Sequence, residues 1–236
     1  MPDYQTCVSR VAVEGVDDLL LRSLLDRQQF DDAEGRAARL GISPAAWPMF
    51  GLLWPSSVQL AARLASRPVS AGERILEIGC GLGLASLVGH RRGADVTASD
   101  NHPLAGSFLE HNLRLNALMP MKYRHGHWSA SPSQRQHALD DGLQPLRGRF
   151  DLIIGSDLLY ERDEDGALAA FIGRHAAPGA SLWIVDPDRG NRASFNRHMA
   201  AQGFARSEER LDRAAAPGIE RYKGRLLSYR ATQWAS

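Results

Sequence analysis

Ile75-Leu76-Glu77-Ile78-Gly79-Cys80-Gly81-Leu82-Gly83-Leu84-Ala85 has the pattern of a strand, a glycine turn and the start of a helix. Glycines at 79, 81 and 83 let the backbone turn tightly and approach a ligand closely. The N-terminus of the following helix offers free N–H groups. The stretch therefore predicts a nucleotide-type site at a strand-to-helix turn of an α/β fold.

Glu77, at the end of the predicted strand, separates two kinds of nucleotide site. A carboxylate repels a pyrophosphate, whereas it attracts ribose hydroxyls and an amino group. The dinucleotide fingerprint G-x-G-x-x-G/A fails in either register, because Leu84 or Ser86 takes its third position. The remaining pattern, E-x-G-x-G-x-G, resembles motif I of class I methyltransferases that use S-adenosyl-L-methionine. The alternative is a purely structural strand–helix turn.

Composition narrows the class of protein. The 236 residues are enough for one α/β domain with a modest addition, and 28 basic against 27 acidic residues give a net charge of +1. Such a balance argues against nucleic acid as a partner. Two cysteines without metal-type pairing indicate a reducing compartment. We see no signal peptide and no apolar run near the ~20 residues that span a bilayer, so we expect a cytoplasmic protein with no membrane partner.

From residue 74 onward, strand and helix patterns alternate. Strands are predicted at 74–78, 95–99, 121–125, 150–155, 181–186 and 226–230, and helices near 84–92, 103–113, 167–175 and 191–202. Continuous apolar runs such as 152–154 are typical of central strands in a parallel sheet covered on both faces. We therefore predict that residues 54–236 form a Rossmann-like domain, with a seven-stranded, mostly parallel sheet and helices on both faces.

Residues 1–53 are predicted to be an N-terminal extension packed on this domain. It begins with a hairpin over 6–25, turning at 14–15, and continues with a short helix over 31–40. Residues 43–55 are rich in Pro and Trp and too apolar for a flexible linker, and a helix opens at Pro55. Residues 129–149 predict an inserted loop with a short helix.

Ligands of open α/β sheets bind beyond the carboxyl ends of the strands. Asp100 and Asn101 follow the second strand, and an acid about 20 residues past the glycine turn commonly binds both hydroxyls of a ribose. Its alternative role is to cap the next helix. Trp128, after the third strand, is suited either to stack on adenine or to pack in the core. His125 and His127 share a strand face, but no third ligand is placed, so we predict no metal site.

The fourth strand ends in Gly155-Ser156-Asp157-Leu158-Leu159-Tyr160, which carries the clue to the reaction. Methyltransferases that act on amide or exocyclic amino nitrogens commonly have Asn-Pro-Pro-Tyr here, and that motif is missing. Asp157 is suited to hold a cationic amine by a charge-assisted hydrogen bond. The alternative is that Asp157 caps a helix and Tyr160 packs in the core.

Asp157-x-x-Tyr160 resembles the post-motif of the seven-β-strand protein-lysine methyltransferases. That group also carries Trp-Pro before motif I, as Trp54-Pro55 here, a Trp after the third strand, as Trp128, and a Pro-Gly-Gly turn similar to 177–179. The resemblance implies S-adenosyl-L-methionine as cofactor and a protein lysine as acceptor. His127 departs from the group, which often has an acid before that Trp.

The resemblance also implies the roles of individual residues. Asp157 and Tyr160 would be catalytic and face the substrate nitrogen. By the resemblance, the cofactor would be contacted by Trp54, Gly79, Gly81, Asp100, Trp128 and Ser156. The glycine motif and the end of the second strand add Glu77, Gly83 and Asn101 to the predicted cofactor-binding residues. Two alternatives stay open: a methyltransferase for a small molecule or nucleic acid on the same fold, and a non-catalytic cofactor-binding partner subunit.

Overall fold

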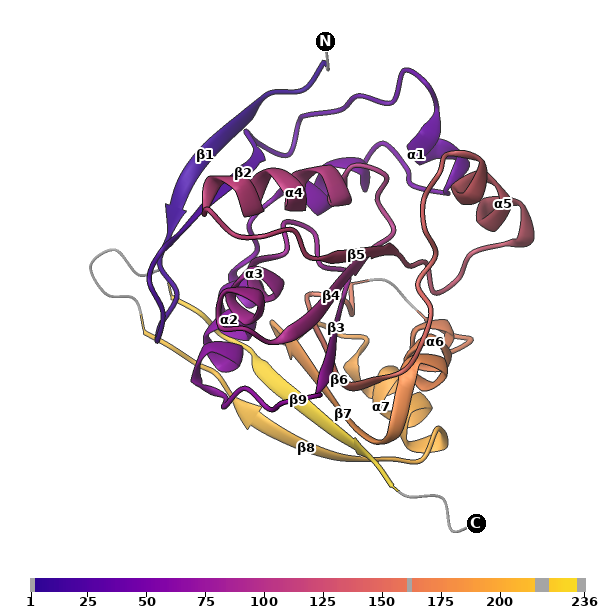
Figure 1. The fold of residues 1–236 in the computed structure, drawn as a ribbon. Coiled ribbons are helices and arrows are strands. Elements are labelled where there is room, and N and C mark those ends of the chain that lie inside the picture. Colours follow the sequence, from indigo (N-terminus) through magenta and orange to yellow (C-terminus); the bar gives the residue numbers. More distant parts are fainter. Residues whose placement is uncertain (1–2, 161–162, 215–220, 233–236) are drawn as a thin grey trace.

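A seven-stranded sheet crosses the molecule in the order β5-β4-β3-β6-β7-β9-β8 (Figure 1). The computed structural model describes residues 3–160, 163–214 and 221–232. Strands β3 to β7 are mutually parallel, whereas β9 runs antiparallel to both β7 and β8. The strands are β3 (Arg74–Ile78), β4 (Asp95–Asp100), β5 (Lys122–His125), β6 (Phe150–Ser156), β7 (Ala176–Asp186), β8 (Phe204–Arg210) and β9 (Arg225–Ala231). The predicted mostly parallel α/β sheet is confirmed.

Helices cover both faces of the sheet, because its central strands are apolar on both sides. In β3, Ile75 packs in one buried cluster, together with residues of α2 to α4, and Leu76 packs in the other, with residues of α6 and α7. This alternation follows from the two-residue period of a strand. The helices are α2 (Pro55–Ser66), α3 (Leu84–Arg91), α4 (Ala105–Leu115), α5 (Pro132–Asp140), α6 (Ala167–His175) and α7 (Arg192–Ala201). In the part of the chain that the structure describes, no helix is both long and apolar enough to cross a bilayer.

The N-terminal segment forms the predicted hairpin, with β1 (Thr6–Val11) antiparallel to β2 (Leu19–Leu24). Asn112 of α4 and Asn116, which caps the C-terminus of α4, bind the backbone of β2. Arg22 N–H donates to Asn112 Oδ1 over 2.7 Å, and Leu20 N–H donates to Asn116 Oδ1 over 2.9 Å. Figure 1 shows the hairpin lying beside α4. The two asparagine side chains take the place of a neighbouring strand, so hydrogen bonds join the hairpin to the main domain.

Residues 43–55 pack against the main domain, as predicted. They contain a short 3₁₀ helix, η1 (Trp47–Gly51), in which Trp47 is fully buried. The Trp47 ring contacts Phe50 edge-on, and Phe50 in turn contacts Phe108 of α4. This aromatic group fixes the segment beside the glycine turn.

Three elements differ from the sequence predictions. Strand β7 begins at Ala176, because Phe150 pairs with Ala176 before a bulge delays the next pairing, of Leu152 with Ser181. The predicted turn at 177–179 lies within this bulge. Strand β8 was not predicted, because all its residues but Phe204 are exposed and show no apolar alternation. The predicted helix at 31–40 shrinks to α1 (Arg36–Arg39).

Replacing Asn112 tests the joint between hairpin and main domain. Asn112 is fully buried, and its amide also donates to Leu82 O in the glycine turn over 3.3 Å. We expect Asn112→Ala to lower the free energy of unfolding by about 1–3 kcal/mol, because the Arg22 N–H loses its buried acceptor. Urea denaturation measures this. Gln136→Ala on the exposed face of α5 is the control. If both changes lowered the free energy of unfolding equally, Asn112 would not be the residue that joins the hairpin to the main domain.

Candidate active site

A cavity of about 300 Å³ opens at the carboxyl ends of the parallel strands. All but one of the eleven residues predicted from the sequence line it: Trp54, Gly79, Gly81, Gly83, Asp100, Asn101, Trp128, Ser156, Asp157 and Tyr160. The exception is Glu77. The structure thus gathers the predicted residues around one hollow, and their contacts with a bound ligand stay predictions.

The glycine turn forms one wall of the cavity. Gly79, Gly81 and Gly83 have φ of 58°, 52° and 74°, in the left-handed region that favours glycine. A Cβ on Gly81 would lie 2.8 Å from the carbonyl oxygen of Phe50, a backbone atom that has no freedom to swing aside. The turn and the N-terminal segment therefore approach each other as closely as a residue without a side chain allows.

Asp100 ties this turn to the end of β4. Its Oδ2 accepts a hydrogen bond from Gly81 N–H over 2.8 Å, and its Oδ1 accepts one from His102 N–H over 2.8 Å. Burial raises the pKa of Asp100, while these N–H groups favour the charged form. Each carboxylate oxygen keeps a second lone pair, so Asp100 can still accept a ribose hydroxyl.

Glu77 lies behind the turn and does not line the cavity. Its Oε2 accepts hydrogen bonds from Ser86 N–H, over 2.8 Å, and from the Ser86 hydroxyl. Complete burial raises the pKa of Glu77 to about 7. Glu77 therefore joins β3 to α3 and supports the turn from below.

Aromatic side chains close the cavity on another side. The indole N–H of Trp54 donates to Met49 O over 2.9 Å, and Phe50 and Trp128 also line the wall. His102, which the sequence analysis did not select, stacks on Phe50 with ring centroids 3.7 Å apart. Its position two residues after Asp100, at the same strand end, is the signal that could have found it.

His102 is a neutral donor in this wall. Burial lowers its pKa to about 3, and its Nδ1 accepts the Leu104 N–H over 3.2 Å, so the ring hydrogen lies on Nε2. Nε2 is buried and has no hydrogen-bond partner among the described residues. His127 also lines the cavity. Within the described ranges, no group of three His, Cys, Asp or Glu side chains is arranged to bind a metal ion.

Asp157 follows β6 in a backbone conformation that is rare for residues other than glycine, with φ of 57°. Such conformations persist only where the surroundings enforce them, and they gather at functional sites. Here the Asp157 N–H donates to Val185 O of β7 over 3.0 Å. The neighbouring strand therefore fixes the place of the Asp157 carboxyl at the cavity.

Arg189 is a cavity residue that the sequence analysis missed. It follows β7, and its Nη2 donates to Asp157 Oδ1 over 2.8 Å. In the sequence, Arg189 directly follows Asp186-Pro187-Asp188 at the end of the predicted strand, and this position at a strand end was the available signal. Asp186 is buried, which raises its pKa, and its Oδ1 accepts the Arg189 N–H over 2.8 Å.

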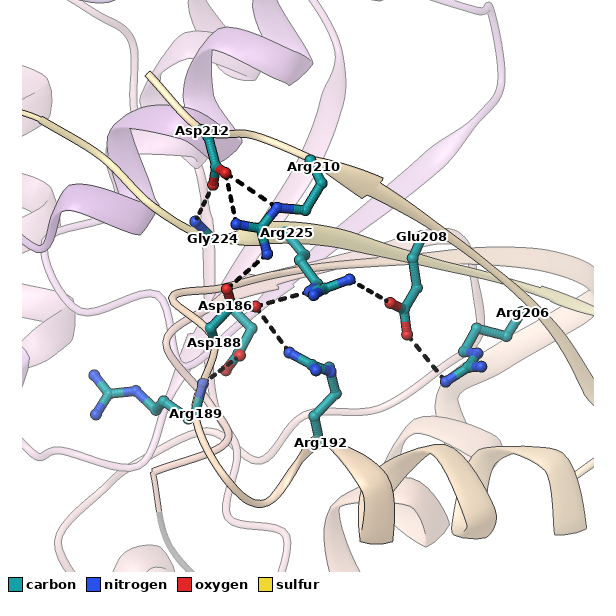
Figure 2. A network of polar contacts seen from close by, with 10 residues as sticks. All are labelled: Asp186, Asp188, Arg189, Arg192, Arg206, Glu208, Arg210, Asp212, Gly224 and Arg225. Carbon is teal, nitrogen blue, oxygen red and sulfur yellow. Dashed lines mark hydrogen bonds and ion pairs between the residues drawn. The ribbon is translucent and has the colours of Figure 1, made fainter. Parts of the chain in front are cut away.

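An ion-pair network supports this loop (Figure 2). Asp188 accepts hydrogen bonds from Arg192, Arg210 and Arg225, which come from α7, β8 and β9. Desolvation acts to raise the pKa of Asp188, but the hydrogen bonds and charges of Arg225 and Arg210 together lower it below its usual value. The loop before Arg189 is thus anchored to three elements.

The methyltransferase domain family matches residues 55–229, most of the chain. The chain belongs to this family. The match begins at the first residue of α2 and ends inside β9. It confirms the predicted methyltransferase and, with it, S-adenosyl-L-methionine as cofactor.

The chain is similar to several lysine methyltransferases. It is 28% identical over 154 residues to the electron transfer flavoprotein beta subunit lysine methyltransferase of Rattus norvegicus, covering 64% of this chain and 55% of that protein. It is 30% identical over 147 residues to the calmodulin-lysine N-methyltransferase of Arabidopsis thaliana, covering 58% of this chain and 45% of that protein. The chain thus spans about half the length of these relatives.

Solved structures share the fold. The T. thermophilus 16S rRNA N2 G1207 methyltransferase, in complex with AdoMet and guanosine, aligns with a TM-score of 0.57 at 18% identity, covering 96% of this chain and 51% of that one. A methyltransferase from Pyrococcus furiosus aligns with a TM-score of 0.56 at 17% identity, covering 84% and 98%. At these identities the likeness establishes the fold alone.

The residues of the cavity fit S-adenosyl-L-methionine. The glycine turn lines the cavity with backbone rather than side chains, Asp100 presents a carboxylate with spare lone pairs, and two tryptophans offer flat apolar faces. His102 adds a buried donor without a partner in the described part of the chain. These groups match a ligand with a ribose and an adenine ring.

Gly81→Ala tests the glycine wall, with Gly93→Ala as its matched control. Both glycines have positive φ, but a Cβ on Gly93 meets nothing within 4 Å. Backbone strain should cost each variant about 1–2 kcal/mol of stability, and Gly81→Ala should cost more, because its Cβ would lie 2.8 Å from Phe50 O. We expect Gly81→Ala alone to weaken S-adenosyl-L-methionine binding, about tenfold or more, in a calorimetric titration. Equal affinities in the two variants would contradict the assigned wall.

Glu77→Gln tests the buried acid. Because the folded-state pKa of Glu77 is raised from 4.5 to about 7, its stabilising contribution is complete below pH 4.5 and is lost as the pH rises to about 7. We expect wild type to lose up to about 3 kcal/mol of unfolding free energy relative to the variant across this window. Urea titrations at several pH values measure it. Glu110 is exposed, so the difference in unfolding free energy between wild type and Glu110→Gln should not change with pH. If the difference between wild type and Glu77→Gln were also independent of pH, the pKa of Glu77 would not be raised.

Proposed function

We propose that the chain transfers a methyl group from S-adenosyl-L-methionine to the side-chain nitrogen of a protein lysine. The observation that carries this proposal is Asp157-x-x-Tyr160 at the end of β6, which puts a carboxylate and a phenol on the cavity that the glycine turn also lines. The similarity to lysine methyltransferases from animals and a plant supports it. A cytoplasmic location stays a prediction from the sequence.

The cofactor would supply a methyl group on a sulfonium, a good leaving group for in-line displacement. The residues then have to position the nitrogen and exclude water. A lysine ammonium has to lose a proton to solvent before its nitrogen can attack the methyl group. Asp157 favours the ammonium form, so it serves to hold and position the amine rather than to act as a strong base. In this proposal Tyr160 orients an N–H of the amine, and Trp54 and Trp128, which line the same cavity, shield the reacting atoms from water.

A second cavity, of about 350 Å³, adjoins the first. The two share Trp128, Ser129, Leu158 and Tyr160, so Tyr160 lies at the boundary between them. The exposed acids Glu164 and Asp165 line the second cavity. This acidic rim supports a cationic acceptor that enters from that side.

Asp157→Asn tests the proposed role. Asparagine tolerates the left-handed backbone at this position and keeps the size of the side chain, so the change removes mainly the charge. We expect methyl transfer to fall about 100-fold or more, because the amine is no longer held in line, while S-adenosyl-L-methionine affinity stays near the wild-type value. The assay incubates lysate proteins with tritiated cofactor and counts methyl-lysine after acid hydrolysis.

Asp140→Asn, on the exposed end of α5, is the charge-matched control and should keep full activity. Full activity of Asp157→Asn would remove Asp157 from the mechanism. Methyl label in wild type that never appears as methyl-lysine would overturn the choice of acceptor.

A further inference from the structure

Asp157 is already paired with a cation of its own chain. The Asp157 and Arg189 side chains meet at 2.8 Å and are only 11% and 33% exposed. The other carboxylate oxygen, Oδ2, is buried and has no hydrogen-bond partner among the residues described. The group that should hold the acceptor amine is therefore occupied on one oxygen and unsatisfied on the other.

The head group of Arg189 is also incompletely satisfied. A guanidinium has five donors, and the buried Nε of Arg189 has no partner within residues 3–160, 163–214 and 221–232. The arginines around it differ, because Arg192, Arg210 and Arg225 all bind Asp188 (Figure 2). Unsatisfied buried polar atoms call for an explanation, and here they cluster on the cavity wall.

The backbone of Arg189, by contrast, is held firmly. Its N–H donates to the buried Asp186 carboxylate, and the preceding residue, Asp188, is bound by three arginines. Figure 2 shows the Arg189 guanidinium pointing away from this network. The side chain can therefore leave Asp157 by changing rotamer, without rearrangement of the loop.

We propose that Arg189 is a specificity-determining residue: an internal cation that occupies the place of the acceptor at Asp157 and is exchanged for the ammonium of the substrate. This inference rests on the proposed function. An incoming ammonium displaces Arg189 and forms an ion pair with Asp157 in its place. A neutral acceptor would leave a largely buried carboxylate unpaired, which is strongly unfavourable. The exchange therefore selects cationic amines over hydroxyl and amide acceptors.

The experiment uses n-butylammonium as a probe of the lysine side chain and n-butanol as its neutral counterpart. The full chain, saturated with S-adenosylhomocysteine, is titrated with each probe by ligand-observed NMR, as wild type, Arg189→Leu and Arg189→Lys. We expect Arg189→Leu to bind butylammonium about tenfold tighter or more, because no internal cation competes. Arg189→Lys keeps a cation and should behave as wild type. Butanol affinity should be the same in all three.

A double variant isolates the role of Asp157. In Arg189→Leu combined with Asp157→Asn, the gain in butylammonium affinity should disappear, because no carboxylate remains. Unchanged or undetectable butylammonium binding in Arg189→Leu overturns the inference, as does a matching gain for butanol. S-adenosylhomocysteine affinity, measured for every variant, shows that the fold and the cofactor site are intact.

These outcomes are independent of the lysine assignment. Absence of methyl-lysine from the wild-type assay defeats the proposed function, whatever butylammonium does. Insensitivity of butylammonium binding to residue 189 defeats the exchange alone.

Discussion

The hydrogen bond from Gly81 N–H to Asp100 is the contact on which the site depends. It joins the turn after β3 to the end of β4, two neighbouring strands of the sheet. Because the acceptor is a carboxylate buried among N–H donors, the bond is charge-assisted and poorly replaced by water. Asp100 thereby holds the glycine turn at the distance from the strand ends that keeps a cavity open between them.

The other parts of the site are supported in the same way, each by an acid that binds a backbone N–H. Glu77 holds the start of α3 through Ser86, and Asp186 holds the loop after β7 through Arg189. All three acids lie at or near the carboxyl ends of parallel strands, where backbone N–H groups of the following turns converge. Asp157 is the exception, because its carboxyl binds a side chain, Arg189, and faces the cavity.

Much of this arrangement could be predicted from local sequence pattern. Strand β3 and helix α6 match the predicted ranges, because apolar runs between glycines leave few alternatives. Gly79, Asp100 and Asp157 were found because ligands of such sheets meet the ends of the strands. Strand β8 was missed because an exposed edge strand carries no apolar period, and its pairing with β9 is a tertiary property.

Residues whose roles come from distant contacts were harder to find. His102 matters because of Phe50, and Arg189 because of Asp157, partners that only the folded chain brings together. For Glu77 the sequence motif predicted a role that the folded structure does not give it. Its place in the motif predicts a ligand contact, yet the two-residue period of β3 turns its side chain toward α3, behind the glycine turn.

The close approach of Phe50 to Gly81 makes the N-terminal segment part of the cavity wall. Residues 42–52 contribute part of the cavity wall, although they lie outside the matched segment at 55–229. Two chains with the same core motifs but different N-terminal segments would therefore have cavities with different walls. A change in this segment alone would reshape the cavity while leaving every residue of the glycine turn and of the strand ends in place.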